Sequence, residues 1–266
     1  MKQLLILSGK GGTGKTTVAG AFIKLSKVKA YADCDVDAPN LHLSLKQFKK
    51  TTLSDFYGMP KAKINPAMCV ACDFCRQSCR FNAIRDGKFY FVDSLSCEGC
   101  GVCEAVCPAG AICMEPAAAG ELKLCQNGDV FSTAQLKIGS GNSGKLVSEV
   151  KKQMTQTSSV TDLAIIDGPP GIGCPAIASI SGVDLILIVA EPSISGISDM
   201  ERVLKIAEIF RTPAAVCVNK YDINITNTQI IENFCSDNNI PFTGKIPFDT
   251  KAVQAINVGQ TIVDID

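Results

Sequence analysis

Short apolar runs rich in β-branched residues alternate along most of the chain with stretches of helical character. The apolar runs, each typical of a strand buried on both faces of a sheet, are Leu4–Leu7, Val28–Ala32, Leu163–Ile166, Leu185–Ala190, Ala214–Val218 and Phe242–Ile246. The helical stretches between them are Lys15–Lys27, Ser143–Gln156, Ser198–Phe210 and Thr228–Asn238. This alternation predicts an α/β fold with a doubly wound, mostly parallel sheet and right-handed crossovers.

The alternation stops between residues 61 and 116, where cysteine, glycine and proline replace strands and helices of normal length. Pro60 and Pro116 bracket this block. We therefore predict that residues 1–60 and 117–266 form one α/β domain and that residues 61–116 form a small α+β domain inserted into it. So short a block buries little apolar core, and bound groups would have to act as its nucleus.

Eight of the fourteen cysteines form two copies of the pattern CxxCxxCxxxC, 28 residues apart. This spacing is typical of the thiolates that bind iron–sulfur clusters in bacterial ferredoxins, where the fourth cysteine of each run ligates the other cluster. By position, one [4Fe–4S] cluster takes Cys69, Cys72, Cys75 and Cys107. The other takes Cys97, Cys100, Cys103 and Cys79. Zinc is the alternative, but zinc sites usually use two separated CxxC pairs.

A phosphate-binding loop precedes the first helical stretch. Gly9–Thr16 satisfies GxxxxGK[ST] and lies between an apolar strand and a helix, as the mechanism requires. Backbone N–H groups would surround the phosphates, Lys15 would reach the outer phosphates, and the Thr16 hydroxyl would bind Mg²⁺. The residues expected to bind nucleotide here are Gly11, Gly12, Thr13, Gly14, Lys15, Thr16 and Thr17. A nucleotide site without catalysis is the alternative.

The loop also contains a second lysine, Lys10, which a plain phosphate loop does not need. The sequence GKGGTGKTT resembles the deviant phosphate loop of the MinD and Mrp group of ATPases, which includes the nitrogenase iron protein. The resemblance implies ATP hydrolysis with Mg²⁺ in a homodimer, or in a heterodimer with a paralogous ATPase, and a catalytic role for Lys10 at the partner's nucleotide. A solvated lysine in an exposed loop is the alternative.

Two aspartate-containing segments resemble the switches of this group. In the first, residues 32–40, the resemblance assigns Asp35 to the attacking water and the Mg²⁺ shell, with Asp33 and Asp37 as rivals. In the second, residues 166–171, it implies that Asp167 holds Mg²⁺ through water and that Gly171 bonds the γ-phosphate. The alternative for a strand-end aspartate such as Asp167 is a helix cap.

Two further features follow from the resemblance. The base-binding corner would comprise Asn219, Asp222, Pro247 and Asp249. Because NKxD is also the pattern with which GTPases hold guanine, GTP is an alternative to ATP. Cys174, seven residues after Asp167, occupies the offset at which the nitrogenase iron protein places a ligand of its interface cluster. We therefore consider it a speculative ligand of an additional cluster at a dimer interface, or a redox thiol, against ordinary packing.

Composition limits the partners. Lys and Arg together number 26, as do Asp and Glu, so no overall charge attracts nucleic acid or an anionic membrane. No apolar run approaches the roughly 20 residues that span a bilayer. The acidic C-terminal residues 262–266 lack the basic amphipathic helix that binds membranes. We expect a cytoplasmic protein in which cysteine serves metal or redox chemistry.

Together these features predict an ATPase in which nucleotide-driven dimer closure gates electron transfer through two [4Fe–4S] clusters to a redox partner. The alternative is an ATP-dependent iron–sulfur scaffold or carrier of Mrp type that serves client proteins. A MinD-like positioning ATPase is a third reading.

Overall fold

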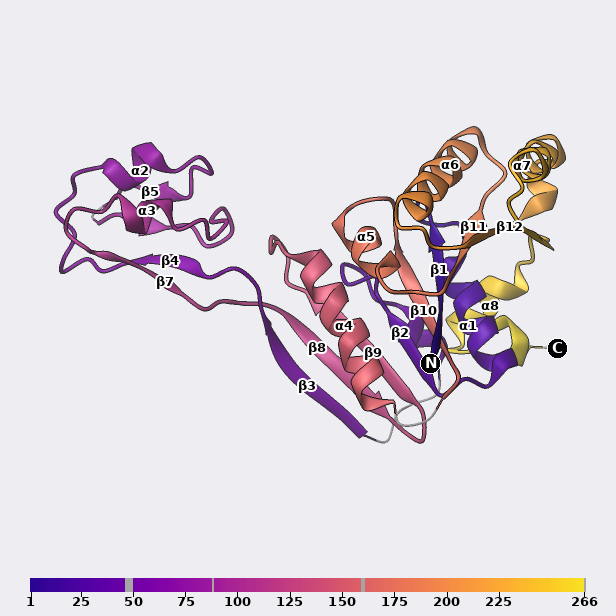
Figure 1. The fold of residues 1–266 in the computed structure, drawn as a ribbon. Coiled ribbons are helices and arrows are strands. Elements are labelled where there is room, and N and C mark those ends of the chain that lie inside the picture. The colour runs from indigo at the N-terminus through magenta and orange to yellow at the C-terminus, as the bar shows by residue number, and fades with distance from the viewer. Residues whose placement is uncertain (46–49, 88, 159–160, 266) are drawn as a thin grey trace. The chain divides into compact units, whose positions relative to one another are not determined.

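The computed structural model describes residues 1–45, 50–87, 89–158 and 161–265 (Figure 1). These residues divide into two compact units. The first unit comprises Met1–Leu53, Leu122–Gln135 and Ser143–Asp266. The second comprises Ser54–Glu121 and Leu136–Asn142. The second unit therefore includes a short segment that lies well beyond the cysteine block in the sequence.

Within the described residues, nine strands form one sheet in the order β13–β12–β11–β1–β10–β2–β9–β8–β3. Their bounds are β1 Lys2–Ser8, β2 Ala30–Asp33, β3 Lys50–Tyr57, β8 Ala118–Gln126, β9 Val130–Leu136, β10 Leu163–Pro170, β11 Leu185–Ala190, β12 Ala214–Asn219 and β13 Phe242–Ile246. All neighbours from β13 to β9 pair in parallel. β8 and β9 are joined by only three residues, and so they are antiparallel. The prediction of a mostly parallel α/β sheet is confirmed.

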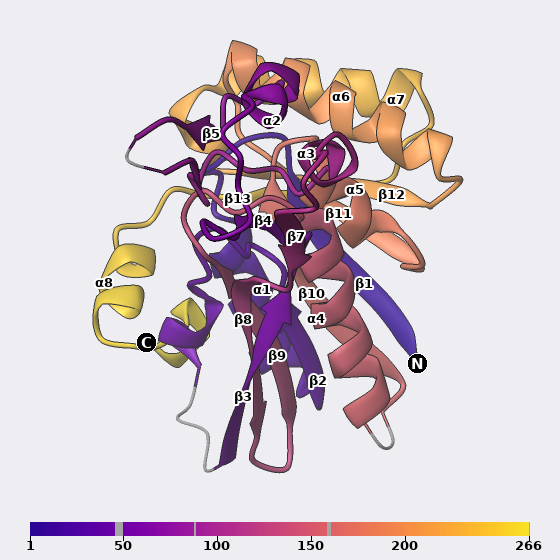
Figure 2. The ribbon, with the colours of Figure 1, turned by 90° about the vertical axis from the view of Figure 1, so that its left-hand side faces the viewer.

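Helices cover both faces of this sheet. Those of the first unit are α1 Lys15–Ser26, α4 Ser143–Thr157, α5 Cys174–Ile180, α6 Ile194–Ile209, α7 Ile225–Asp237 and α8 Lys251–Asn257, with single 3₁₀ turns at Leu41–Ser44, Tyr221–Ile223 and Ile262–Asp264. The connection from β1 to β2 runs toward the β3 edge of the sheet, whereas the connections from β9 to β13 run toward the β13 edge. Because all these crossovers are right-handed, α1 lies on one face of the sheet and α4 to α7 lie on the other. α8 lies on the same face as α1 (Figures 1 and 2).

The core explains why the strands appear as continuous apolar runs. Leu5, Ile6 and Leu7 of β1 are all fully buried, so consecutive side chains on both faces of the strand are covered. On one face Val18 of α1 packs in the core cluster that contains Ile6. Each fully buried side chain of this size contributes about 1.5–3 kcal/mol to folding.

Two helices begin earlier than their sequences predict. α6 starts at Ile194 because the Ser193 side chain accepts a hydrogen bond from Gly196 N, and α7 starts at Ile225 because Asn224 accepts one from Asn227 N. These are N-caps that satisfy the unpaired N–H groups of the first turn.

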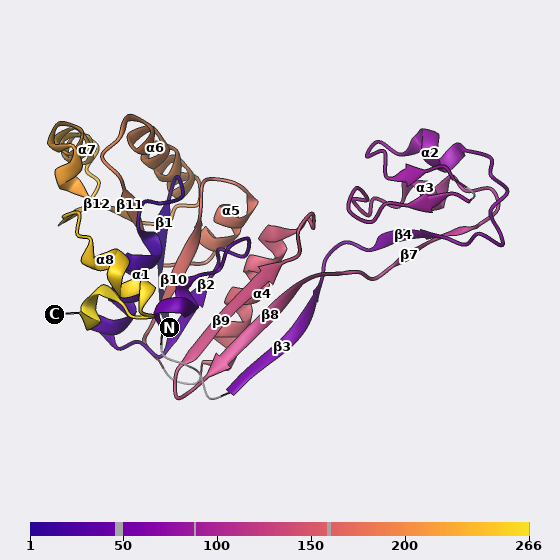
Figure 3. The same cartoon turned by 180° about the vertical axis from the view of Figure 1, so that it is seen from behind.

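The second unit contains two small two-stranded antiparallel sheets and two short helices (Figure 3). Its elements are β4 Lys61–Ile64, α2 Phe74–Ser78, β5 Ile84–Arg85, β6 Phe91–Val92, α3 Val102–Ala105 and β7 Ile112–Glu115. β4 pairs antiparallel with β7, with Ile64 opposite Ile112, and β5 pairs antiparallel with β6, with Ile84 opposite Val92. A shift of 28 residues converts 64 into 92 and 84 into 112, so the sequence repeat is also a structural repeat.

Candidate nucleotide and cysteine sites

The phosphate-binding loop joins the end of β1 to the start of α1. Gly12 and Gly14 have φ values of 81° and 94°, a backbone conformation that side chains disfavour. A Cβ on Gly14 would also lie 2.2 Å from Asn219 Nδ2, and one on Gly9 would lie 2.3 Å from Asp199 Cβ. The glycines are therefore required by the curvature of the loop and by its neighbours.

Lys15 lies at the start of α1 and is only 6% exposed. Burial lowers the pKa of its ammonium group, while Asp167, Asp35 and Asp33 act in the opposite direction. None of the ion pairs found among the described residues includes Lys15. A partly desolvated ammonium group therefore lies near a cluster of carboxylates at the carboxyl edge of the sheet.

The first switch segment is shaped by Asp33, at the end of β2. Its carboxylate accepts hydrogen bonds from the backbone N–H groups of Asp35, Asn40 and Leu41, at 3.0, 2.9 and 3.0 Å. Asp33 therefore organises the loop that positions Asp35. Asp35 is only half-buried, and burial raises the pKa of its carboxyl. Of the three candidates, Asp37 is exposed.

Asp167, on β10, is the most unusual polar group in the site. It pairs with Asp33 across the sheet and is 1% exposed, and neither carboxylate oxygen comes within hydrogen-bond distance of a partner in the described part of the chain, although the nearby Thr16 hydroxyl acts to lower its pKa. Burial and the nearby Asp33 raise the pKa of this carboxyl. A helix cap would accept a backbone hydrogen bond, so that alternative is not supported. A buried carboxylate without a partner fits a bound cation, and oxygen ligands suit Mg²⁺.

The second switch is closed against β1. Gly171 has a φ of 87° and its N–H donates to Ser8 O at 3.0 Å. A bond from Gly171 to a γ-phosphate, which the resemblance implies, would require this hydrogen bond to break.

Lys10 is held by residues at the start of α6. Its Nζ lies 2.6 Å from Glu191 Oε2 and donates to the Ser193 and Ser195 hydroxyls at 3.0 and 3.1 Å. The alternative of a solvated lysine is therefore wrong for this conformation. Sequence reasoning missed Glu191, although its place directly after β11, at the same sheet edge as the loop, was an available signal.

Three of the four expected base-binding residues already make hydrogen bonds within the chain, Asp249 by accepting one from Lys251 N at 2.8 Å. Asn219 Nδ2 donates to Thr13 O at 2.7 Å and so supports the phosphate-binding loop. Asp222 accepts from Phe248 N at 2.7 Å, which ties the two walls of the corner together. Pro247 and Asp249 are exposed. Base recognition by these residues stays a prediction.

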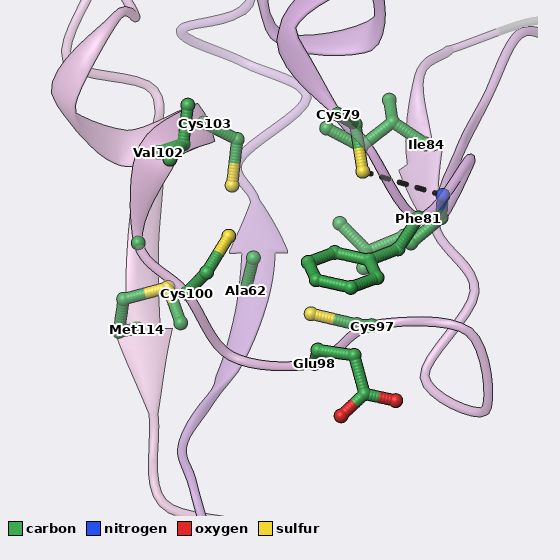
Figure 4. Close-up of a pocket in the computed structure, with 13 residues that line it drawn as sticks. Ala62, Cys79, Phe81, Ile84, Cys97, Glu98, Cys100, Val102, Cys103 and Met114 are labelled. Atoms are coloured by element: carbon green, nitrogen blue, oxygen red, sulfur yellow. Dashed lines mark hydrogen bonds between the residues drawn. The ribbon is translucent and has the colours of Figure 1, made fainter.

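The eight repeated cysteines line two separate hollows of the second unit, in the two sets predicted from their order. One hollow is lined by Cys79, Cys97, Cys100 and Cys103, and Figure 4 shows their sulfur atoms turned toward a common space. The other is lined by Cys69, Cys72, Cys75 and Cys107. Each hollow thus takes three cysteines from one run and the fourth from the other.

Backbone N–H groups point at the crossing cysteines. Ala83 N donates to Cys79 Sγ at 3.4 Å, shown as the dashed line in Figure 4, and Ala111 N donates to Cys107 Sγ at 3.3 Å. The two bonds are again related by 28 residues. Hydrogen bonds of this kind stabilise thiolate sulfur and tune iron–sulfur clusters.

The two hollows differ in their other lining residues. Asp73 lines one of them and is bound by both Arg76, at 2.6 and 2.8 Å, and the Tyr90 hydroxyl, at 2.9 Å. These partners hold the pKa of Asp73 well below its usual range. The other hollow carries Phe81 and Glu98 instead. Sequence reasoning found no signal for this difference.

Within the described ranges, no group of three or more His, Cys, Asp or Glu side chains is arranged to hold a metal ion. Cys174 is exposed at the start of α5, and its role stays a prediction.

No helix in the part of the chain that the structure covers is both long enough and apolar enough to cross a membrane.

Comparisons place this site among known proteins. The family model described as the CobQ/CobB/MinD/ParA nucleotide binding domain matches residues 4–262. The uncharacterized protein MJ0578 of Methanocaldococcus jannaschii is 33% identical over 248 residues, which cover 92% of this chain and 86% of that protein. A second protein of the same organism, the uncharacterized protein MJ0579, is 27% identical over 273 residues. This alignment covers 99% of this chain and 93% of MJ0579.

A solved structure, the septum site-determining protein MinD complexed with Mg-ADP from Pyrococcus horikoshii, superposes with a TM-score of 0.58 and 18% sequence identity. The superposed part covers 99% of this chain and 88% of the MinD chain. This likeness shows the fold.

Proposed function

Because the chain belongs to the CobQ/CobB/MinD/ParA nucleotide-binding family, we propose that it is an ATP-hydrolysing switch that carries two [4Fe–4S] clusters and gates electron transfer through them. The observation that carries the proposal is the pair of cysteine-lined hollows, each completed by a cysteine from the other run. The nucleotide site lies in the first unit and the clusters would lie in the second.

The nucleotide site supports hydrolysis through three groups. Lys15 supplies positive charge for the outer phosphates, and Thr16 and Asp167 would hold Mg²⁺, which neutralises charge on the phosphates when bound. Asp35 would orient the attacking water from the loop that Asp33 fixes. The buried Asp167 carboxylate, which lacks a hydrogen bond, supports this assignment because a cation would compensate its charge.

The cysteine sites support clusters over zinc. Four thiolates around one zinc ion lie about 3.8 Å apart, since the Zn–S distance is about 2.3 Å in a tetrahedron. Each hollow here takes three cysteines from one run and the fourth from the other, which is the ligand pattern of a two-cluster ferredoxin and not of two separate CxxC pairs. The 28-residue repeat and the two N–H to sulfur bonds also support a matched pair of clusters.

The dimer is the proposed moving part. Lys10 is held by its own Glu191 in this conformation, and the proposed closed dimer would transfer it to the partner's nucleotide. Both a homodimer and a heterodimer with a paralogous ATPase fit this scheme. The heterodimer is supported by the occurrence of two related proteins, MJ0578 and MJ0579, in one organism.

Anaerobic purification with iron and sulfide analysis tests the cluster half of the proposal. We expect about eight iron atoms per chain, and about four after Cys79→Ala, because that change removes one ligand from one hollow only. Cys113→Ala is the matched control, since Cys113 is exposed on β7 and lines neither hollow. Iron equal to the wild type in Cys79→Ala, or one zinc per hollow, would contradict the proposal.

Adding ATP and Mg²⁺ to the same samples tests gating. The proposal expects a change in the spectra or potentials of the clusters on nucleotide binding. Unchanged spectra in a nucleotide-saturated protein would contradict gating, because the clusters would then not respond to the nucleotide.

A second candidate is an ATP-dependent cluster scaffold or carrier. It is favoured by the exposure of Cys72 and Cys100, which leaves one ligand of each hollow open to an acceptor protein. Transfer of iron–sulfur clusters to an apo-ferredoxin, accelerated by ATP, would support this carrier. If no iron is found, a MinD-type nucleotide switch is the reading that remains, and sedimentation with liposomes tests it.

A further inference from the structure

The two cysteine-lined hollows are related by the 28-residue repeat, so most lining residues have a counterpart in the other hollow. At several apolar positions the counterparts are alike: Ala83 and Ala111, Ile84 and Ile112, Val92 and Ile64. The charged neighbours of the cysteines do not follow the repeat, since Asp73 and Arg76 correspond to Gly101 and Glu104. Two clusters held in these hollows would therefore meet similar apolar walls and different charges.

In the hollow that contains Cys69, the carboxylate of Asp73 is already paired. The Arg76 guanidinium binds it at 2.6 and 2.8 Å, and the Tyr90 hydroxyl donates to it at 2.9 Å. Arg76 thus supplies the cation that compensates a carboxylate next to Cys72.

A lysine of β4 is bound to a cysteine of the other hollow. Lys61 Nζ donates to Cys97 O, and this bond is partly buried. Lys61 takes part in none of the ion pairs found among the described residues. Its counterpart in the repeat is Phe89, which has no cation to offer Cys69. The bond from Lys61 to Cys97 therefore has no equivalent at the other hollow.

The position of Lys61 couples its charge to the hollow. The bonded carbonyl and the sulfur belong to one residue, Cys97, which is only 7% exposed, so water screens the charge weakly. Reduction adds an electron to an iron–sulfur cluster, and a nearby cation stabilises the reduced state and raises its potential. Glu98 and Glu104 adjoin cysteines of the same hollow, but both are exposed and water screens them more strongly.

We propose that Lys61 holds Cys97 in place and raises the reduction potential of the cluster in the Cys97 hollow alone, so that the two clusters are inequivalent. Lys61 is a positioning residue in this role, because it acts on the cluster through Cys97. The inference rests on the proposed function, since it concerns the clusters that the two hollows would hold.

Reductive titration of the whole, anaerobically purified protein, followed by electron paramagnetic resonance, tests this role. Lys61→Gln removes the charge but keeps a donor for Cys97 O, whereas Lys61→Arg keeps the charge. In Lys61→Gln we expect one of the two potentials to fall by at least about 28 mV, which is a threefold loss in the equilibrium constant of a one-electron reduction. Lys61→Arg should show little of this shift. Cys79→Ala identifies the affected cluster, because this variant should lose the same signal.

Two further variants serve as controls. Lys63→Gln removes a lysine two residues along β4 whose side chain is 66% exposed and pairs with Glu115 at 3.0 Å, and neither potential should change. Arg76→Gln leaves Asp73 without its cation and should lower the other potential instead.

The outcomes separate this role from the proposed function. In a protein with about eight iron atoms, the inference is overturned if Lys61→Gln leaves both potentials unchanged, lowers both equally, or lowers the same potential as Arg76→Gln. Loss of the Cys97 cluster alone from Lys61→Gln, with iron retained in Lys61→Arg, would support the role, whereas loss of both clusters would count against it. A wild type without iron would overturn the proposed function itself.

Discussion

Asn219→Ala distinguishes two roles for a residue at the end of β12. The resemblance to the MinD and Mrp group places Asn219 in the base-binding corner. In the structure its side chain, only 9% exposed, instead donates to Thr13 O at 2.7 Å and fixes the phosphate-binding loop. A base contact would affect one nucleotide more than another, whereas support of the loop would affect all nucleotides equally.

The expected magnitude follows from the lost bond. Removing the donor leaves a buried carbonyl without its partner, which costs about 1–3 kcal/mol. The loop escapes this cost by relaxing, and the nucleotide must then restore its curvature on binding. The same free energy therefore opposes binding, and the Kd should rise by about 5- to 150-fold. Asn219→Asp should weaken binding further, because it also puts a carboxylate near the phosphates.

Titration calorimetry with ATP and with GTP measures the effect, alongside thermal unfolding. Asn238→Ala is the matched control, since Asn238 Nδ2 also donates to a backbone carbonyl, Phe234 O at 2.8 Å, but at the end of α7. Loop support predicts that both affinities fall by the same factor in Asn219→Ala. An ATP affinity within about twofold of the wild type, or a large change in the ratio of ATP to GTP affinity, would refute the reasoning.

Three further predictions concern buried or paired charges in the first unit. Lys151→Met removes an ammonium group that donates to two carbonyls at the end of α5, at 2.7 and 2.6 Å, and should lower the free energy of unfolding by about 2–4 kcal/mol. In urea titrations the exposed neighbour Lys152→Met should change it by less than about 0.5 kcal/mol, and equal effects would contradict the role of the buried bonds. Glu191→Gln weakens the half-exposed pair with Lys10, worth about 0.2–1 kcal/mol, and should lower the protein concentration for ATP-dependent dimerisation by about 1.5- to 5-fold in ultracentrifugation. A higher concentration requirement would argue against release of Lys10. The pKa of Asp264 is lowered to about 2 by its bond to a lysine of α1, so its stabilising contribution should be complete above about pH 4 and lost between pH 4 and 2. Asp264→Asn should flatten this part of a plot of thermal stability against pH, and an unchanged slope would show that the pair contributes nothing.

Two strands have the bounds that their apolar runs indicate. In β11 five of the six residues are buried, as expected for a parallel strand covered on both faces. β13 also has the predicted bounds, although it is the edge strand and none of its residues is buried. β2 is shorter at its start than predicted, since Lys27 has a φ of 54° and the chain turns there after α1.

Three strands of the large sheet, β3, β8 and β9, were not predicted, and the side chains of β3 show why. In β3 only Phe56 is buried among Lys50–Tyr57, so the strand carries no apolar run and no clean alternation. Its structure comes from pairing with a neighbour that is distant in the sequence, which no local pattern reports. α8 was missed for a related reason: of its residues only Ala255 is buried.

At the functional sites, residue types were predictable and their contacts were not. The two sets of cysteines were assigned from the ligand pattern of two-cluster ferredoxins, and their binding of clusters stays a prediction. Glu191 was missed although it directly follows a predicted strand, because its contact with Lys10 joins two segments that are far apart in the sequence. The support that Asn219 gives to Thr13 is likewise a contact between distant segments.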